Sequence, residues 1–385
     1  MKPLTTVLTF ALAVLAHATS AAASDCLDAA TAKSIQDWVR RGDCLRAAKQ
    51  YTASIEAYRR GLAENPAGSR DLHLGMADAY DELGQYVDEL RSVQAALQLD
   101  SADPEALYAL GIAYEQLRDY PLAIENFQKV LTIRPNDNRA LRNIGFVLLQ
   151  QDKPEAALKP LEAAIEIDPN DWKAHLNLSS AYTRTREALY NELQLLSRQG
   201  SHEVSKREIE LPMKINEFPY DAKALEHSRE AARLNPDDFI TQYGLGTKLL
   251  NDPKALPEAI DALQRAAVIR PEYRVLRNLA IAQQRADRAP DAYETCKRIL
   301  AISDNDKWMI TMKGQLEMTM GHLEDAEKSF RASLALDDQD WTVSVSLAKS
   351  IRGLGRNADA QLEIDKAKQI HPELAQVIDG FFKKP

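Results

Sequence analysis

Apolar residues recur along most of this chain at helical spacing, in stretches separated by short polar segments. Within residues 104–137, the recurring apolar, small and turn-forming residues are Leu107, Leu110, Gly111, Tyr114, Tyr120, Ala123, Phe127 and Pro135. About 34 residues later, the same kinds of residue stand at Leu141, Ile144, Gly145, Leu148, Pro154, Ala157, Leu161 and Pro169. This spacing predicts two amphipathic helices in each stretch, joined by a turn.

The sizes of these residues indicate how the two helices of a stretch pack. Gly111 and Ala123 are small, so the helices can approach closely, and the large side chain of Phe127 fills the space between them. Pro135 cannot continue a helix and marks where the next stretch starts. Further copies of the pattern start near Ile35, Arg70, Trp172, Phe239, Tyr273, Lys307 and Trp341.

The recurring pattern resembles the tetratricopeptide repeat family, whose units are helix-turn-helix pairs. The resemblance implies an all-α fold, a right-handed superhelical solenoid in which each repeat buries its apolar face against its neighbours. It covers residues 35–185 and 219–372, the two halves of the array. Residues 186–218 are predicted as an insertion, because Pro212 falls where a first helix needs a small residue. We expect a helix plus a loop, either as a long helical hairpin or as a protruding loop, and a passive, degenerate repeat is the alternative. Residues 373–385 are predicted as a capping helix.

The first residues have the features of a secretory signal peptide. Lys2 is basic, Leu4–Ala16 is almost entirely apolar, and Ala21–Ala23 supplies an A-x-A cleavage site. We therefore predict a signal peptide at 1–23 and an N-terminal cap segment at 24–34, in a periplasmic or secreted protein without an integral membrane segment after cleavage. A retained membrane anchor is the alternative, although the apolar run is shorter than the roughly 20 residues that span a bilayer.

The three cysteines could contribute a disulfide only if the chain is exported, because thiols are oxidised outside the cytoplasm. Cys26 and Cys44 are close enough in sequence to form a disulfide that would pin the cap segment. Two free thiols are the alternative. Cys296 falls on a core position of a second helix, so we expect a buried and unreactive thiol.

Charge and motifs argue against several classes of function. The formal net charge is −9, and an acidic chain has no general attraction to phosphate backbones, so we expect no nucleic-acid partner. The sequence contains no H-x-x-x-H or H-E-x-x-H spacing, no G-x-S-x-G elbow, no phosphate loop and no G-x-G-x-x-G fingerprint. We therefore predict no enzymatic activity, no metal site and no cofactor.

In the tetratricopeptide family the first helices line a concave groove, which binds peptides. The polar residues that the resemblance places there are Arg139, Arg142 and Asn143, then Lys173 and Asn177 with Arg184 nearby, then Arg274 and Asn278 beside Arg277. A cation and an Asn four residues apart share one helix face. Asn suits a peptide backbone and Arg suits a carboxylate. The arrangement partly resembles the family's asparagine ladder and carboxylate clamp. Ordinary solvated side chains are the alternative.

Apolar residues also fall on predicted groove positions. Tyr108, Ile112 and Phe146 would form an apolar floor beside the basic residues, and Trp308 and Met312 would grip an apolar partner segment. Packing against neighbouring helices is the alternative for each of them.

These features favour a non-catalytic protein- or peptide-binding scaffold. The alternative is an accessory subunit of an envelope secretion, polysaccharide-export or cell-wall assembly complex, in which the insertion or the convex surface would matter more than the groove. The sequence leaves the partner, the pathway and the oligomeric state open.

Overall fold

A computed structural model of the chain describes residues 26, 32–65, 67–199 and 206–382. These residues form helices and turns, with no strand among them, which confirms the predicted all-α repeat fold. The chain divides into two compact units, one ending at Ala224 and the other beginning at Leu225. Each unit is described by itself. The predicted signal peptide at 1–23 lies outside the described residues.

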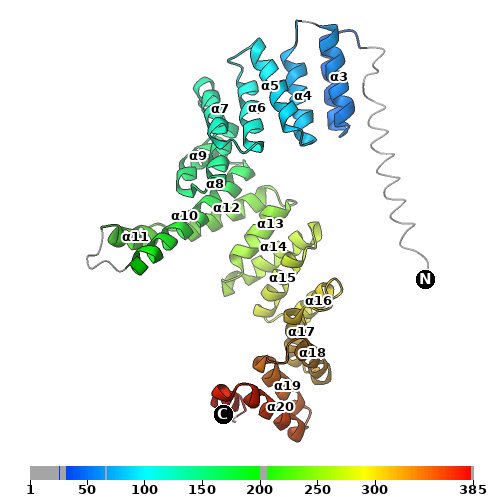
Figure 1. Cartoon of the computed structure of the whole chain (residues 1–385), viewed down its shortest axis with the longest axis vertical. Helices are drawn as coiled ribbons and strands as arrows, with labels where there is room; N and C mark the ends of the chain where they lie inside the picture. Colours follow the sequence, from blue (N-terminus) through cyan, green and yellow to red (C-terminus); the bar gives the residue numbers. More distant parts are fainter. Residues whose placement is uncertain (1–25, 27–31, 66, 200–205, 383–385) are drawn as a thin grey trace, which may run out of the picture. The chain divides into compact units, whose positions relative to one another are not determined.

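The first unit is built from consecutive helices that pack side by side (Figure 1). Its helices are α2 (Ile35–Ala47), α3 (Tyr51–Glu64), α4 (Arg70–Glu82), α5 (Tyr86–Leu99), α6 (Pro104–Gln116), α7 (Tyr120–Ile133), α8 (Asn138–Gln150), α9 (Pro154–Ile167), α10 (Trp172–Gln199) and α11 (Lys206–Glu217). Helix α12 (Tyr220–Leu234) begins in this unit and ends in the second.

The second unit repeats the same arrangement. Its elements are α13 (Phe239–Leu249), η1 (Pro253–Ala255), α14 (Leu256–Ile269), α15 (Tyr273–Arg285), α16 (Ala289–Leu300), α17 (Lys307–Thr319), α18 (Leu323–Leu336), α19 (Trp341–Gly353), α20 (Asn357–Ile370), η2 (Pro372–Leu374) and α21 (Ala375–Gly380).

Close packing within several helix pairs depends on glycine in the first helix. A Cβ atom on Gly145 of α8 would lie 2.4 Å from Cγ of Leu161 on α9, and one on Gly111 of α6 would lie 2.5 Å from the Phe127 ring of α7. Both distances are shorter than a carbon–carbon contact, so only glycine fits. Phe127 and Leu161 are themselves fully buried.

Aspartate side chains fix where several first helices begin. Asp137 accepts a hydrogen bond from the Ala140 amide at 3.1 Å at the start of α8, and Asp306 accepts one from the Met309 amide at 3.0 Å at the start of α17. These caps satisfy amides that have no partner inside the helix. They set the register of the first helices, which carry the predicted site.

The insertion forms two packed helices. Helix α10 continues the first helix of its repeat without a break to Gln199, and the second half, where a loop was expected, contains helix α11 with Pro212 inside it. Leu211 and Ile215 lie one turn apart on α11 and are buried in a cluster with Leu189 of α10. That apolar pair explains why the segment is helical despite its proline.

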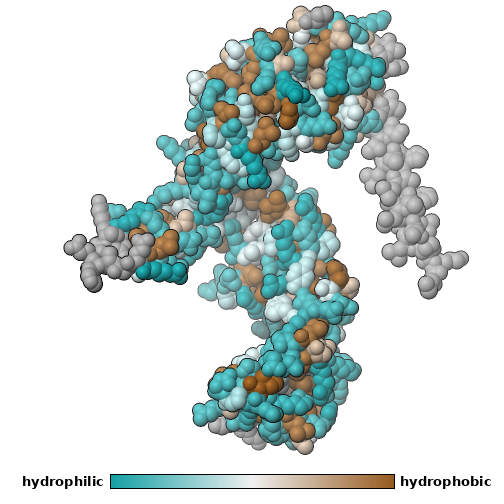
Figure 2. Space-filling model, in the orientation of Figure 1, coloured by the Kyte–Doolittle hydropathy of each residue, from teal (hydrophilic) through white to brown (hydrophobic). Residues whose placement is uncertain are grey.

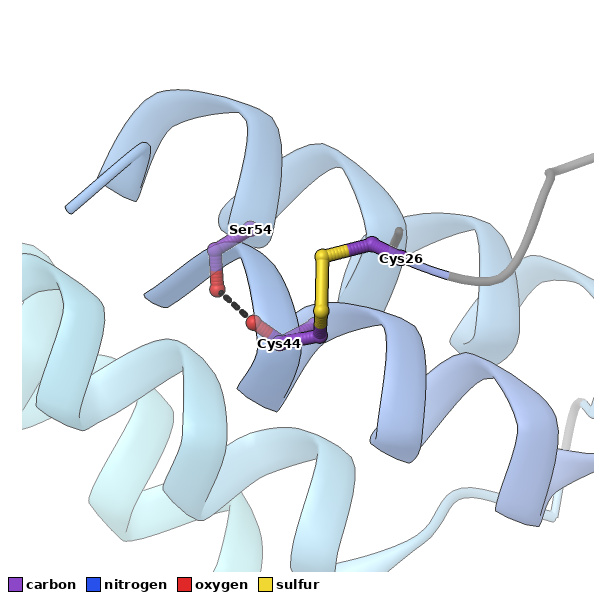
Figure 3. Close-up of a disulfide and its surroundings, with 4 residues drawn as sticks. Cys26, Cys44 and Ser54 are labelled. Atoms are coloured by element: carbon purple, nitrogen blue, oxygen red, sulfur yellow. Dashed lines mark hydrogen bonds between the residues drawn. A yellow bond between two sulfur atoms is a disulfide. The ribbon is translucent and has the colours of Figure 1, made fainter. Parts of the chain in front are cut away.

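Both ends of the array carry a covering element. Cys26 and Cys44 are joined by a disulfide, which ties the segment before α2 to that helix (Figure 3). Beside it, the Ser54 hydroxyl of α3 donates a 2.8 Å hydrogen bond to the Gly42 carbonyl of α2. At the other end, Ile378 of α21 is fully buried against α19 and α20.

Candidate functional site

Four first helices carry the predicted site residues. Helix α8 holds Arg139, Arg142, Asn143 and Phe146; α10 holds Lys173, Asn177 and Arg184; α15 holds Arg274 and Asn278; α17 holds Trp308 and Met312. The first two helices belong to the first unit and the other two to the second. The residues therefore form two separate groups.

In the first unit, Tyr108 of α6 contacts two predicted residues of α8. Asn143 donates a hydrogen bond from Nδ2 to the Tyr108 hydroxyl at 2.8 Å, and the Arg139 guanidinium carbon lies 4.7 Å from the centre of the Tyr108 ring. A guanidinium over an aromatic face is attracted by the negative charge of that face. Burial raises the pKa of Tyr108, so its hydroxyl remains protonated at neutral pH.

In the second unit, Tyr243 of α13 makes the same two contacts with α15. Asn278 donates from Nδ2 to the Tyr243 hydroxyl at 3.3 Å, and the Arg274 guanidinium carbon lies 5.2 Å from the ring centre. Asn278 follows Tyr243 by the same 35 residues that separate Asn143 from Tyr108. We call each of these sets a Tyr-Arg-Asn set.

The two arginines differ in how strongly the chain itself neutralises them. Arg139 lies 3.0 Å from Glu105 and 3.2 Å from Asp137. In the second unit, Ile240 occupies the place of Glu105, as the second residue of its helix. Arg274 pairs with Glu272 at 2.8 Å, and its side chain is 60% exposed. It is therefore the more accessible of the two to a partner carboxylate.

Two other predicted site residues hold neighbouring repeats together. Arg142 lies 2.7 Å from Asp171, and both side chains are largely buried. Arg184 donates to the Leu149 carbonyl at 2.8 Å and to Asp152 at 2.8 Å. Because their donors are directed at the preceding or following repeat, these arginines mainly stabilise the packing between neighbouring repeats.

Lys173 and Asn177 make the fewest polar contacts of the predicted residues. Lys173 is exposed, with its ammonium 5.6 Å from the centre of the Trp172 ring, and Asn177 is half-buried. Within the described part of the chain, neither side chain makes a hydrogen bond or an ion pair. Phe146 of α8 is half-buried. These three remain accessible to a ligand.

Trp308 and Met312 of α17 differ in how far their side chains are exposed. Trp308 is 42% exposed, and the Arg277 guanidinium carbon lies 4.8 Å from its ring. Met312 is buried in the core of the second unit with Val275, Leu276 and Leu279. Met312 is therefore a core residue in this structure, as in the alternative of packing against neighbouring helices.

The comparisons with known proteins identify the repeat. Two family models described as tetratricopeptide repeat match the chain, one over residues 104–137 and the other over residues 311–375. The chain is a tetratricopeptide-repeat protein. No curated protein matched its sequence.

Solved structures resemble this tetratricopeptide-repeat protein at low sequence identity. The human IFIT1 dimer with m7Gppp-AAAA aligns over 88% of this chain and 72% of its own, with a TM-score of 0.50 and 12% identity. MamA from Desulfovibrio magneticus RS-1 covers 52% of this chain and 96% of its own, with a TM-score of 0.38 and 24% identity. YrrB, a TPR protein with an unusual peptide-binding site, covers 57% and 96%, with a TM-score of 0.37 and 20% identity. At this identity, the IFIT1 alignment indicates a shared fold alone.

Several charged residues on the first helices of this tetratricopeptide-repeat protein border a hollow and were not predicted from the sequence. A hollow of about 500 Å³ in the first unit is lined by α2, α4, α6 and α8, and Arg46, Arg70, Asp78 and Glu105 border it. Arg46 pairs with Asp78 at 2.5 Å across two repeats. Aligning the copies by position would have found Glu105 and Asp78, because they stand at the first-helix positions of Arg139 and Phe146.

The remaining chemistry of this tetratricopeptide-repeat protein is limited. Cys296 is fully buried, and burial raises the pKa of its thiol to about 12, so it is not a thiolate at neutral pH. No group of His, Cys, Asp or Glu side chains among the described residues could hold a metal ion. In the same part of the chain, no helix combines the length and apolar character that crossing a membrane requires.

Proposed function

We propose that this chain is a non-catalytic scaffold that binds extended segments of partner proteins against the first helices of its repeats. The recurrence of the Tyr-Arg-Asn set in both units supports the proposal more than any other observation. Each set presents a rigid aromatic ring, a partly exposed guanidinium and an amide held in one orientation. Tyr, Trp and Arg are the residues that dominate protein interfaces.

The second unit favours an acidic partner segment. Arg270 lies 4.8 Å from the Phe239 ring and Arg277 lies 4.8 Å from the Trp308 ring. Neither arginine forms an ion pair within the described residues, and Arg274 has only Glu272. Stacked guanidinium groups keep their edge N–H donors free, and these donors match a carboxylate.

We propose a polypeptide partner instead of a nucleic acid. The net charge of −9 opposes association with a polyanion. The aromatic rings of the second unit are already covered by arginines, which leaves less ring surface for stacking bases. The m7Gppp-AAAA ligand belongs to IFIT1, whose similarity to this chain concerns the fold.

We propose that the scaffold acts in the periplasm or outside the cell. The signal-peptide features of residues 1–23 support export, and a disulfide between Cys26 and Cys44 suits an oxidising compartment. Cell fractionation followed by N-terminal sequencing tests this proposal. The expected result is a mature chain in the envelope or medium that starts after Ala23, and an uncleaved cytoplasmic chain would contradict it.

Affinity capture from an envelope extract tests the scaffold function. The purified chain should retain a partner that the double variant Arg274→Ala/Arg277→Ala loses by about tenfold or more, as expected for interface arginines. The matched control is Arg229→Ala/Arg233→Ala, which removes the same charge from exposed positions on α12. Equal capture by wild type and the first variant would reject binding at α15.

The alternative role as an accessory subunit of an envelope complex is supported by the insertion. Leu195 of α10 and Ile209 and Met213 of α11 are 58%, 58% and 54% exposed, and Figure 2 shows apolar surface on this hairpin. Exposed apolar patches of this kind mark interaction sites. Capture that is lost in Ile209→Ser/Met213→Ser, but kept in the control Val268→Ser at an 85% exposed position, would favour this role.

A further inference from the structure

The C-terminal ends of two first helices in the first unit carry a concentration of carboxylates. Asp78, Asp81 and Glu82 lie in the last turns of α4, and Glu115 lies in the last turn of α6. The C-terminus of a helix already has partial negative charge, so acidic side chains there are unfavourable to stability. No basic residue stands in the last turn of either helix. Stability alone therefore does not explain this arrangement.

Glu89 of α5 adds a buried carboxyl group beside the same residues. Its side chain is 3% exposed, and Oε2 has no hydrogen-bond partner. Glu89 is the fourth residue of its helix. The other second helices except α12, which has Lys223, carry Ser or Ala at that position: Ser54, Ala123, Ala157, Ala259, Ala292, Ala326 and Ala360. A small residue suffices for packing there, so the glutamate has no evident structural purpose.

Negative charge exceeds positive charge around Glu89. The charged groups that act on it are Asp78 and Asp81 from α4 and Glu115 from α6. Arg46 of α2 reaches Asp78, but it is shared with Asp43. Burial and these neighbouring carboxylates raise the pKa of Glu89 to about 8, and burial also raises the pKa of Asp81 and Glu115. The cluster is therefore short of cations.

The geometry favours several separate cations over one metal ion. The carboxylates are not grouped closely enough to form a metal site among the described residues. They are spread over α4, α5 and α6. Asp78 also borders the hollow of about 500 Å³, whose other charged lining residues include Arg46, Arg70 and Arg139. Lys and Arg side chains on one polypeptide segment would match this spread, because each can reach a different carboxylate.

We propose that the acidic cluster of Asp78, Asp81, Glu89 and Glu115 binds a lysine- or arginine-bearing segment of a partner protein, and that Glu89 releases its proton to solvent when the segment binds. This site goes beyond the proposed function, because it is a second surface of opposite charge to the arginines of α15. The arrival of a cation replaces the missing counter-charge and favours the ionised carboxylate.

Titration of the purified chain with a fluorescein-labelled peptide of alternating Lys and Ala tests the surface. A peptide of the same length with Glu in place of Lys is the specificity control. The Lys peptide should bind, and Asp81→Asn/Glu115→Gln should weaken binding about tenfold or more, as for partly desolvated charge pairs. Equal binding of the two peptides would overturn the proposal.

A matched variant separates the cluster from the net charge of the chain. Glu56→Gln/Glu125→Gln makes the same change in charge at exposed positions on α3 and α7. It should bind the Lys peptide as the wild type does, and equal weakening in both variants would overturn the proposal. Arg274→Ala/Arg277→Ala should also retain the Lys peptide, so this site and the proposed function can fail independently.

Calorimetry in two buffers of different ionisation enthalpy tests the role of Glu89. At pH 7 the wild type should release up to about one proton per Lys peptide bound, and Glu89→Gln should release markedly less. The Gln side chain has the shape of a protonated Glu, so circular dichroism of this variant should match the wild type. Binding without proton release in the wild type would remove Glu89 from the site.

Discussion

The guanidinium of Arg142 lies 2.7 Å from the carboxylate of Asp171, across the boundary between two consecutive repeats. Asp171 also accepts hydrogen bonds from the Lys173 and Ala174 amides at 3.1 Å each, so one carboxylate both starts α10 and joins it to α8. Arg142 was predicted to bind a ligand, and in the structure it instead holds two consecutive repeats together.

Arg142→Ala should destabilise the contact between α8 and α10. The variant leaves the buried Asp171 carboxylate without its main counter-ion, which costs about 1–3 kcal/mol of local unfolding free energy. Hydrogen exchange of the α8 and α10 amides measures this loss. Arg91→Ala, which removes a pair with Asp88 at 73% and 45% exposure, is the control and should cost less than about 0.5 kcal/mol. Unchanged exchange in Arg142→Ala would contradict the assignment.

Gly145→Ala should lower stability despite the higher helix propensity of alanine. The added methyl group would lie 2.4 Å from Leu161 and force α8 and α9 apart, at a cost of about 1–3 kcal/mol. Thermal unfolding followed by circular dichroism measures the effect. Gly244→Ala is the control, because nothing lies within 4 Å of its added Cβ, and it should gain up to about 1 kcal/mol. A stable Gly145→Ala variant would contradict the packing.

Denaturing thiol titration should detect one free thiol before reduction and all three cysteines after it, because Cys26 and Cys44 are paired and Cys296 is free. The double variant Cys26→Ser/Cys44→Ser should lower the free energy of unfolding of the first repeat by about 3 kcal/mol. The rate of proteolysis near residue 32, which should be higher in the double variant than in the wild type, gives a second measurement. Three free thiols in the chain isolated from its own compartment would reject the bridge.

Stability should fall as pH rises from about 5 to about 8, in part because of Glu89. Its folded pKa of about 8 exceeds the unfolded value of about 4.3, so between these values only the folded state holds the proton. Each pH unit then removes up to about 1.4 kcal/mol. Urea unfolding of Glu89→Gln should show a weaker decline, with a gain over the wild type at pH 8. Parallel pH profiles for both proteins would show that Glu89 does not titrate in this range.

Features that depend on residues close together in the sequence could be predicted, and features that depend on long-range contacts could not. Helix pairs, their starts and the need for glycine at 111 and 145 depend on residues that are near neighbours or one repeat apart, so the pattern predicted them. The sequence left a helical hairpin and a protruding loop open for the insertion, and the burial of Leu211 and Ile215 decides for the two helices. The burial of that pair against Leu189 is a tertiary contact.

For the site, the pattern placed Arg139, Asn143, Arg274 and Asn278 on first helices, and the structure joins each pair to a tyrosine of the preceding repeat. It left open whether Met312 binds a partner or is buried. It did not indicate that Arg142 is neutralised by Asp171 or that Glu89 lies among three other carboxylates. Each of those facts depends on a partner in another helix. The spacing of residues within one helix does not show which residues of other helices lie against it.

The sequence by itself determined the unit of construction, since the spacing of apolar and small residues within one repeat dictates two helices and their packing faces. The tertiary structure alone decided which side chains on those helices are left for a partner. Neutralisation and burial of a charge depend on what the next repeat places against it, and both change the free energy of binding at that position.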